Sequence, residues 1–187
     1  MPKSTIRKKT YQAIYRLLNR VSPIQGDCGV LCGCACCDFE RLQGKAKDAQ
    51  FGMYLLPGED KVFTRKEDWL SWSADTVEKY DFPASWTGQV YFVVCKTPPH
   101  CVRELRPIQC RTFPLAPHID KEGAFHLVWN TEPLTYQCPL VAARAPLQDR
   151  FIRATYTVWK RLITDPMIYD FVVLDSQYRG QDVDIVM

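Results

Sequence analysis

The sequence contains neither a long hydrophobic run nor a strong excess of one charge. No apolar stretch reaches the roughly 18 residues that a membrane-spanning helix needs, and we find no secretory signal. The 24 basic and 21 acidic residues leave a net charge of only +3, which is too balanced to indicate nucleic-acid binding. We therefore expect no membrane partner, no nucleic-acid partner and a cytoplasmic location. The first 26 residues contain Lys and Arg but no acidic residue, which we interpret as the solvated face of an N-terminal helix.

Familiar catalytic motifs are missing as well. The chain has no glycine-rich phosphate loop and no G-x-S-x-G nucleophile motif, and the segment LLPGED at 55–60 predicts only a turn. Its 187 residues, 47% of them hydrophobic, are enough to form the core of one domain without covalent cross-links. The reason for its cysteines must therefore lie elsewhere.

Cysteine is abundant and clustered. Five of the nine cysteines fall in the ten positions from Cys28 to Cys37, and the other four are spread from Cys95 to Cys138. Disulfide scaffolds belong to small secreted proteins, whereas in a reducing compartment this density indicates metal or redox chemistry. The chain lacks the two separate CxxC pairs of a zinc ribbon, so we expect a site that collects ligands from several segments.

Thiolates favour zinc, copper(I) and iron–sulfur clusters. Four thiolates around Zn(II) leave a net charge of about −2, which nearby cations and N–H donors must balance. Arg106 and Arg111 flank Cys110 and are candidates for balancing this charge or for binding an anionic cofactor. The alternative is that each arginine pairs with an ordinary carboxylate. Of the histidines, His100 is the best candidate ligand because it adjoins Cys101. His126 is expected to point to solvent.

The segment ELRPIQCRTFPLAP resembles the RP-x-x-CR-x-(F/Y)-P signature of the YkgJ family, whose members are described as zinc- or iron-chelating cysteine-cluster proteins. The matching positions include Arg106, Pro107, Cys110 and Arg111, and the resemblance extends over roughly residues 28–140. It implies a metal site formed by Cys32, Cys36, Cys37, Cys95, Cys101, Cys110 and Cys138. The spacing leaves open which of Cys28, Cys32 and Cys34 binds the metal. Our first four ligands are Cys36, Cys101, Cys110 and Cys138.

The hydrophobic pattern predicts an α+β fold: a small mixed domain with irregular loops stapled by metal, short strands or a hairpin, and flanking helices. We expect one domain over 1–187, with an N-terminal helix at 4–20 capped by Ser4 or Thr5. The cysteine-cluster region covers 27–140 and the C-terminal helices cover 146–178. Within the central region we predict a hairpin with strands at 53–56 and 61–63, a short helix at 64–72, a proline-fixed irregular stretch at 98–117, and strands at 88–96 and 124–130. The tail after Gly180 is expected to fray.

Two classes of function fit these features. The first is a metal-binding protein of undefined biochemical role in which cysteine thiolates from dispersed segments bind zinc. The alternative is an iron–sulfur cluster protein with a redox or protein-modifying activity, because a related cysteine pattern occurs in flagellin lysine N-methylases. The sequence leaves open whether the chain is an enzyme.

Overall fold

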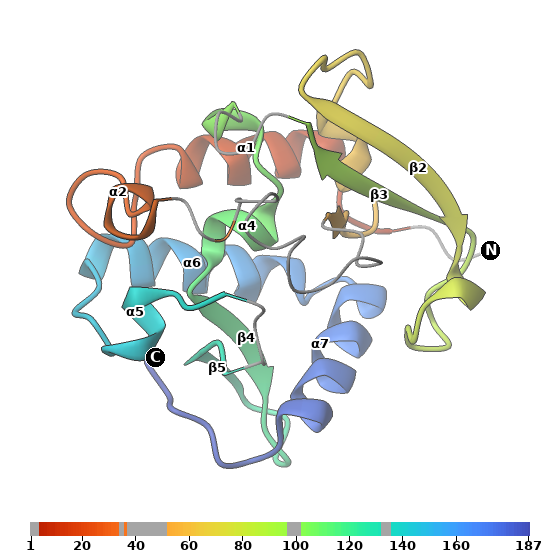
Figure 1. Cartoon of the computed structure of the whole chain (residues 1–187). Coiled ribbons are helices and arrows are strands. Elements are labelled where there is room, and N and C mark those ends of the chain that lie inside the picture. The colour runs from red at the N-terminus through yellow and green to blue at the C-terminus, as the bar shows by residue number, and fades with distance from the viewer. Residues whose placement is uncertain (1–3, 34–35, 37–51, 97–101, 132–135) are drawn as a thin grey trace.

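The computed structural model of the chain describes residues 4–33, 36, 52–96, 102–131 and 136–187. Helices and two small antiparallel sheets form a mixed α+β arrangement, as the hydrophobic pattern predicted (Figure 1). In chain order the elements are α1 (Lys8–Leu18), α2 (Gly29–Cys32), β1 (Met53–Tyr54), η1 (Glu59–Val62), β2 (Leu70–Thr76), η2 (Val77–Lys79), β3 (Gln89–Cys95), η3 (Arg103–Leu105), α4 (Ile108–Thr112), β4 (Leu115–Ile119), β5 (Phe125–Trp129), α5 (Pro139–Ala142), α6 (Asp149–Leu162) and α7 (Pro166–Arg179).

The N-terminal helix α1 is shorter than predicted. It begins at Lys8, and neither Ser4 nor Thr5 caps it. Both residues instead donate hydrogen bonds to Asp165 at the start of α7, with oxygen–oxygen distances of 3.0 and 2.9 Å. The capping prediction is therefore wrong: hydroxyls that were expected to accept from backbone N–H groups of α1 instead donate to a distant carboxylate.

The first sheet has the strand order β1-β3-β2, and all its pairs are antiparallel. The strand predicted at 61–63 is wrong, since η1 occupies most of that range. The helix predicted at 64–72 is also wrong, and β2 begins within that range, at Leu70. Thr64 and Glu67 do make the expected capping contacts, with a Thr64 N to Glu67 Oε1 distance of 2.7 Å. No helix follows, because β2 pairs with β3 along its whole length.

The second sheet pairs β4 with β5, and the C-terminal tail extends it. Leu127 N donates to Met187 O at 2.7 Å, and Val186 N donates to Leu127 O at 2.8 Å. The expectation of a frayed tail is therefore wrong. These bonds also explain why Pro117, opposite Leu127, is tolerated in a strand. The backbone N–H and C=O of Leu127 both bond to the tail, so no hydrogen bond between Leu127 and Pro117 is lost when proline supplies no N–H.

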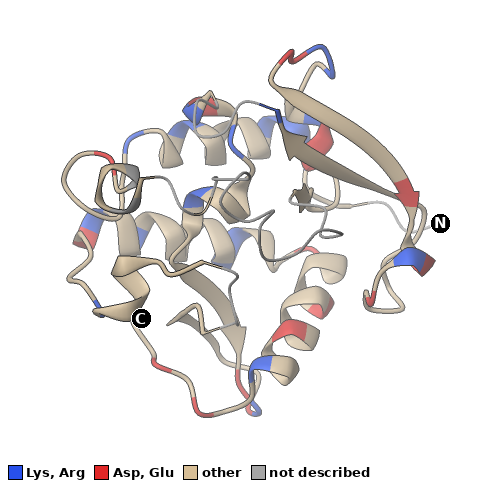
Figure 2. Ribbon diagram, in the orientation of Figure 1, with Lys and Arg blue, Asp and Glu red and all other residues tan. Residues whose placement is uncertain are grey.

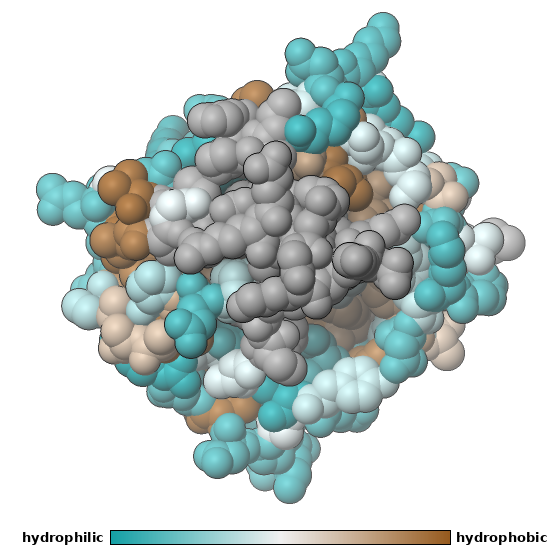
Figure 3. All heavy atoms as spheres, viewed as in Figure 1, coloured by the Kyte–Doolittle hydropathy of each residue, from teal (hydrophilic) through white to brown (hydrophobic). Residues whose placement is uncertain are grey.

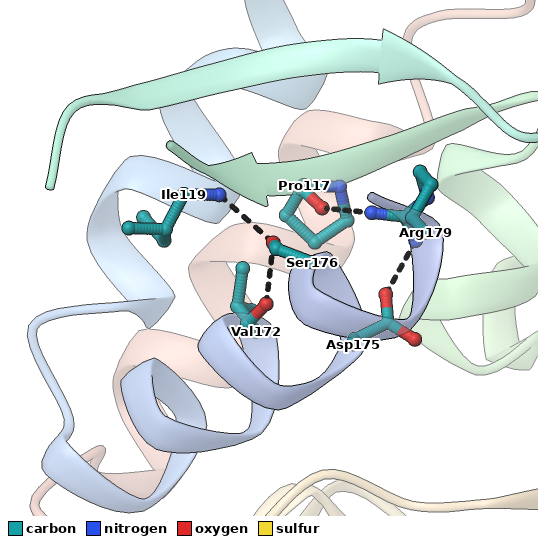
Figure 4. Close-up of polar contacts among 6 residues, drawn as sticks. All are labelled: Pro117, Ile119, Val172, Asp175, Ser176 and Arg179. Atoms are coloured by element: carbon teal, nitrogen blue, oxygen red, sulfur yellow. Dashed lines mark hydrogen bonds and ion pairs between the residues drawn. The ribbon is translucent and has the colours of Figure 1, made fainter. Parts of the chain in front are cut away.

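Helix α7 covers the other edge of β4 (Figure 4). Ser176 Oγ accepts a hydrogen bond from Ile119 N at 2.9 Å and donates to Val172 O at 2.6 Å. Arg179 donates to Pro117 O at 3.1 Å and pairs with Asp175 one turn earlier. Side chains of α7 thus satisfy backbone groups that an exposed strand edge would leave unpaired.

A continuous hydrophobic core joins α1, α6 and α7 to both sheets. On α6 the buried side chains recur with helical spacing, at Phe151, Ala154, Thr155, Val158, Trp159 and Leu162. The tryptophans are buried or half-buried, as expected of core residues. By contrast, Val30 and Leu31 of α2 are 83% and 56% exposed, where Figure 3 shows a hydrophobic patch at the left of the view. No helix in the described part of the chain is long and apolar enough to cross a membrane.

Candidate metal centre

The short helix α4 carries Cys110 and Arg111 and is held in place by a buried carboxylate. Glu59 is fully buried, and its Oε1 accepts hydrogen bonds from Ile108 N at 2.8 Å and from the Tyr15 hydroxyl at 2.7 Å. Its Oε2 accepts from Leu56 N at 3.0 Å. Because a five-residue helix has little stability of its own, these contacts are what fix α4 against α1 and η1.

Burial and hydrogen bonding act in opposite directions on this carboxylate. Burial is the larger influence and raises the pKa of Glu59, while the hydrogen bonds from Ile108, Tyr15 and Leu56 lower it. Burial also raises the pKa of Tyr15, and the adjacent Glu59 raises it further. The phenol therefore stays protonated and remains a donor to the carboxylate.

Two of the predicted ligands are neighbours of Met53. Cys110 Sγ is 3.5 Å from Met53 Sδ. Met53 pairs with Val93 across the sheet, and Cys95 is two residues further along β3. Residues two apart on a strand share a face, so Cys95 is a diagonal cross-strand neighbour of Met53. Cys95 and Cys110, which are 15 positions apart in the sequence, are thus both related to Met53, Cys110 by a side-chain contact and Cys95 by the strand register.

Three arginines surround α4. Burial, together with the positive charges of Arg103 and Arg106, lowers the pKa of the Arg111 guanidinium to about 10, against the opposing influence of Tyr15 and Glu104. Arg111 donates to Glu104 O at 3.1 Å and to Asn19 Oδ1, and its guanidinium lies 5.2 Å from the centroid of the Tyr15 ring. The helix that carries Cys110 is therefore surrounded by positive charge that an anionic site would stabilise.

The other predicted ligands have varied positions. Cys36 is exposed, and Cys138 is half-buried at the residue before α5. Figure 1 draws α2 and α5 at the left and α4 nearer the centre. Cys37 and Cys101 lie outside the described residues, and so does the side chain of Cys32. Cys28, which we left open, is half-buried and packs against the core.

Histidine contributes little to this region. His118 is buried in β4, while His126 is half-buried and its Nε2 lies 2.8 Å from Asp120 Oδ2, so the expectation that it points to solvent is only partly met. His100 is outside the described residues. Within the described ranges, no three His, Cys, Asp or Glu side chains are grouped closely enough to hold one metal ion.

Several residues that shape this region escaped the sequence analysis. Glu59 was interpreted only as part of a turn, and that turn does form, with Gly58 at φ 86°. Met53, Tyr15 and Arg103 were not singled out. For Glu59 the one available signal was an acidic residue between two hydrophobic segments, and this does not distinguish a buried carboxylate from a solvated one.

Comparison with protein-family models, with curated protein sequences and with solved structures gave no match to this chain. The resemblance to the YkgJ family therefore rests on the cysteines and the RP-x-x-CR-x-F-P segment alone.

Proposed function

We propose that this chain is a metal-binding protein, similar to the YkgJ family, in which cysteine thiolates from dispersed segments bind zinc. The observation that supports this best is the convergence of Cys95 and Cys110 on Met53. The Cys110 thiol lies next to the Met53 thioether, and Cys95 is on the strand paired with Met53; soft sulfur groups of this kind suit a thiophilic metal. The remaining ligands would come from Cys36 and Cys138 and from Cys32, Cys37 and Cys101.

The charge around α4 supports the same proposal. Burial, and to a lesser extent the positive charges of Arg103 and Arg106, disfavour the charged form of Arg111. A zinc–thiolate site with net negative charge would favour the charged form of Arg111. Arg106 and Arg111 then act as cationic groups around the metal or around an anionic cofactor. A cytoplasmic location fits this chemistry, because a reducing compartment keeps thiols available to metals.

Elemental analysis of the full chain, purified under nitrogen, tests the proposal. We expect about one zinc per chain. Removal of the metal with a strong chelator should lower the melting temperature, since metal binding contributes to folding. About three or four irons per chain, together with inorganic sulfide, would instead support the iron–sulfur alternative. A chain with no stoichiometric transition metal, and with thermal unfolding unchanged by chelator, would overturn both.

Single substitutions identify the ligands. We expect Cys110→Ser and Cys95→Ser each to reduce bound metal about tenfold or more at limiting metal concentration. Ser73→Ala is the control, because Ser73 is an exposed residue of β2 opposite Phe92 and the substitution alters no cysteine. Equal metal content in all three variants would exclude Cys95 and Cys110 as ligands.

A further inference from the structure

An aromatic cavity lies between α7 and the segment that links β2 to β3. Its volume is about 190 Å³, and its lining includes Tyr54, Tyr80, Phe82 and Phe171, with the carboxylates of Asp81 and Asp175. Tyr178 and Leu174 complete the wall. None of these residues belongs to the candidate metal centre, so the cavity has a different chemistry and is independent of the proposed metal function.

The aromatic walls stand nearly at right angles to one another. The ring of Tyr54 makes an interplanar angle of 82° with Phe82, at a centroid separation of 4.9 Å, and of 82° with Phe171, at 5.7 Å. Rings in different orientations therefore line one cavity, because Tyr54 packs edge to face against both Phe82 and Phe171. Aromatic faces carry the negative part of the ring quadrupole and attract cations.

The charged groups at the cavity are predominantly acidic. Asp175 pairs with Arg179, whose side chain is only 2% exposed, whereas Asp81 accepts a hydrogen bond from the Tyr178 hydroxyl. Two carboxylates against one guanidinium leave an excess negative charge at the cavity. Figure 2 shows acidic positions along α7, where the cavity has one of its walls.

The combination of rings and carboxylates selects one class of cation. A hard metal ion such as Ca²⁺ needs six or more oxygen ligands, and two carboxylates in an aromatic wall do not provide them. A primary ammonium is strongly hydrated and has three N–H donors to satisfy. An alkylated ammonium has a diffuse charge and apolar methyl groups, so it suits ring faces and needs only long-range attraction from the carboxylates.

We propose that this cavity binds a quaternary ammonium group. Its methyl groups contact Tyr54, Phe82 and Phe171, and its positive charge is balanced by Asp81 and Asp175. Tyr178 is 69% exposed and is hydrogen-bonded across to Asp81, so it covers the outer side of the cavity.

Choline is the probe for the test, with its uncharged carbon analogue dimethylbutanol and the unmethylated amine ethanolamine as comparisons. Trp86 stacks on Phe82 with ring centroids 4.2 Å apart, so its fluorescence provides the readout. We expect saturable binding of choline with a dissociation constant of about 1 mM, and binding at least about fivefold weaker for both comparison compounds. Nuclear Overhauser contacts from the choline methyls to the rings of Tyr54 and Phe171 locate the site.

Two variants separate charge from ring contact. Asp81→Asn keeps an acceptor for Tyr178 but removes one negative charge, and Phe82→Leu removes an aromatic face; each should weaken choline binding about fivefold. Asp68→Asn, an exposed carboxylate on the segment before β2, is the control and should bind as the unaltered chain does. Because Phe82→Leu disturbs the ring cluster, Asp81→Asn decides the outcome if that variant misfolds. Equal binding of dimethylbutanol, or no saturable choline binding, would overturn the proposal.

Discussion

At the scale of single residues, Glu59 has the greatest influence on the candidate metal centre, although it is not a predicted ligand. Its carboxylate joins three segments: α1 through Tyr15, the turn before η1 through Leu56, and α4 through Ile108. Charged residues are almost never fully buried unless they are paired or well hydrogen-bonded, and Glu59 meets this condition with three donors. The position of Cys110 therefore depends on a side chain 51 positions earlier in the sequence.

Glu59→Gln should reduce the free energy of unfolding in a pH-dependent way. The amide replaces one accepting oxygen by a donor, which leaves a buried N–H without a partner and costs about 2 kcal/mol. In the unaltered chain, burial raises the pKa of Glu59, so the stability that this group contributes is present below the ordinary glutamate pKa and is lost as pH rises through the raised value. The difference between the two chains should therefore be largest near about pH 5 and smaller near about pH 8.

Urea denaturation of both chains across this pH range measures the effect. Glu122→Gln is the control, because Glu122 is an exposed residue in the turn between β4 and β5. Parallel stability curves for the unaltered chain and Glu59→Gln would contradict the raised pKa.

Sequence reasoning at this scale identified chemically distinctive residues but not their partners. Cys110 and Arg111 were recognised because thiolates bind metals, because arginine can balance their charge, and because the segment resembles the RP-x-x-CR-x-(F/Y)-P signature. Met53 lies 57 positions from Cys110, and nothing local predicts that contact. Side-chain contacts between distant segments follow from the packing of the whole chain. Composition and local spacing therefore do not predict them.

At the scale of elements, the clearest structural device is the start of α7. The side chain of Asp165 is fully buried and accepts hydrogen bonds from Met167 N at 3.0 Å and Ile168 N at 3.3 Å, which makes it a helix cap. It also accepts from Thr5 N at 2.5 Å, which ties the N-terminal segment to this helix. Aspartate at the cap and proline at the first helical position are local signals in the sequence for the start of such a helix.

Asp165→Ala should destabilise the chain more than loss of a helix cap normally does. A cap alone is worth about 1 kcal/mol, and here the donors of Ser4 and Thr5 lose their acceptor as well, so we expect a loss of about 2 to 4 kcal/mol. Urea denaturation gives the value. Asp149→Ala is the control: this residue is in the first turn of α6, is exposed, and should cost less than about 1 kcal/mol. A similar loss in both variants would show that Asp165 acts only through local helix electrostatics.

Elements whose signals are local were predicted better than those that depend on pairing. The strands β3 and β5 and the helices α6 and α7 coincide closely with the predicted ranges, because their hydrophobic patterns are long and regular. The helix predicted at 64–72 overlaps the start of β2; the Thr64–Glu67 capping pattern is present, but the register with β3 determines the outcome. β4 was predicted as irregular because of Pro117, and only its pairing with Leu127 makes that proline acceptable.

At the scale of the whole molecule, segments near both ends of the described chain are held by the same C-terminal half. Ser4 and Thr5 contact Asp165, and residues 184–187 pair with β5. Most of the cysteines that the structure describes lie on or beside short elements: α2, α4, the end of β3 and the start of α5. Such short elements gain most from a shared metal, because its bonds replace the contacts that long helices and strands provide. The tail and the proposed metal thus stabilise different parts of one core.

Ending the chain after Gly180 should expose the outer edge of β5 and reduce stability. The backbone bonds from Leu127 to Met187 at 2.7 Å and from Trp129 N to Asp184 O at 3.0 Å would be lost, and we expect a decrease in the free energy of unfolding of about 2 to 4 kcal/mol. An exposed strand edge also promotes self-association, which light scattering detects. Asp184→Asn is the control: it removes only the exposed ion pair with Arg144, at 2.7 Å, and should cost less than about 1 kcal/mol. If the shortened chain unfolds at the same urea concentration and stays monomeric, the tail is not a structural strand of this sheet in solution.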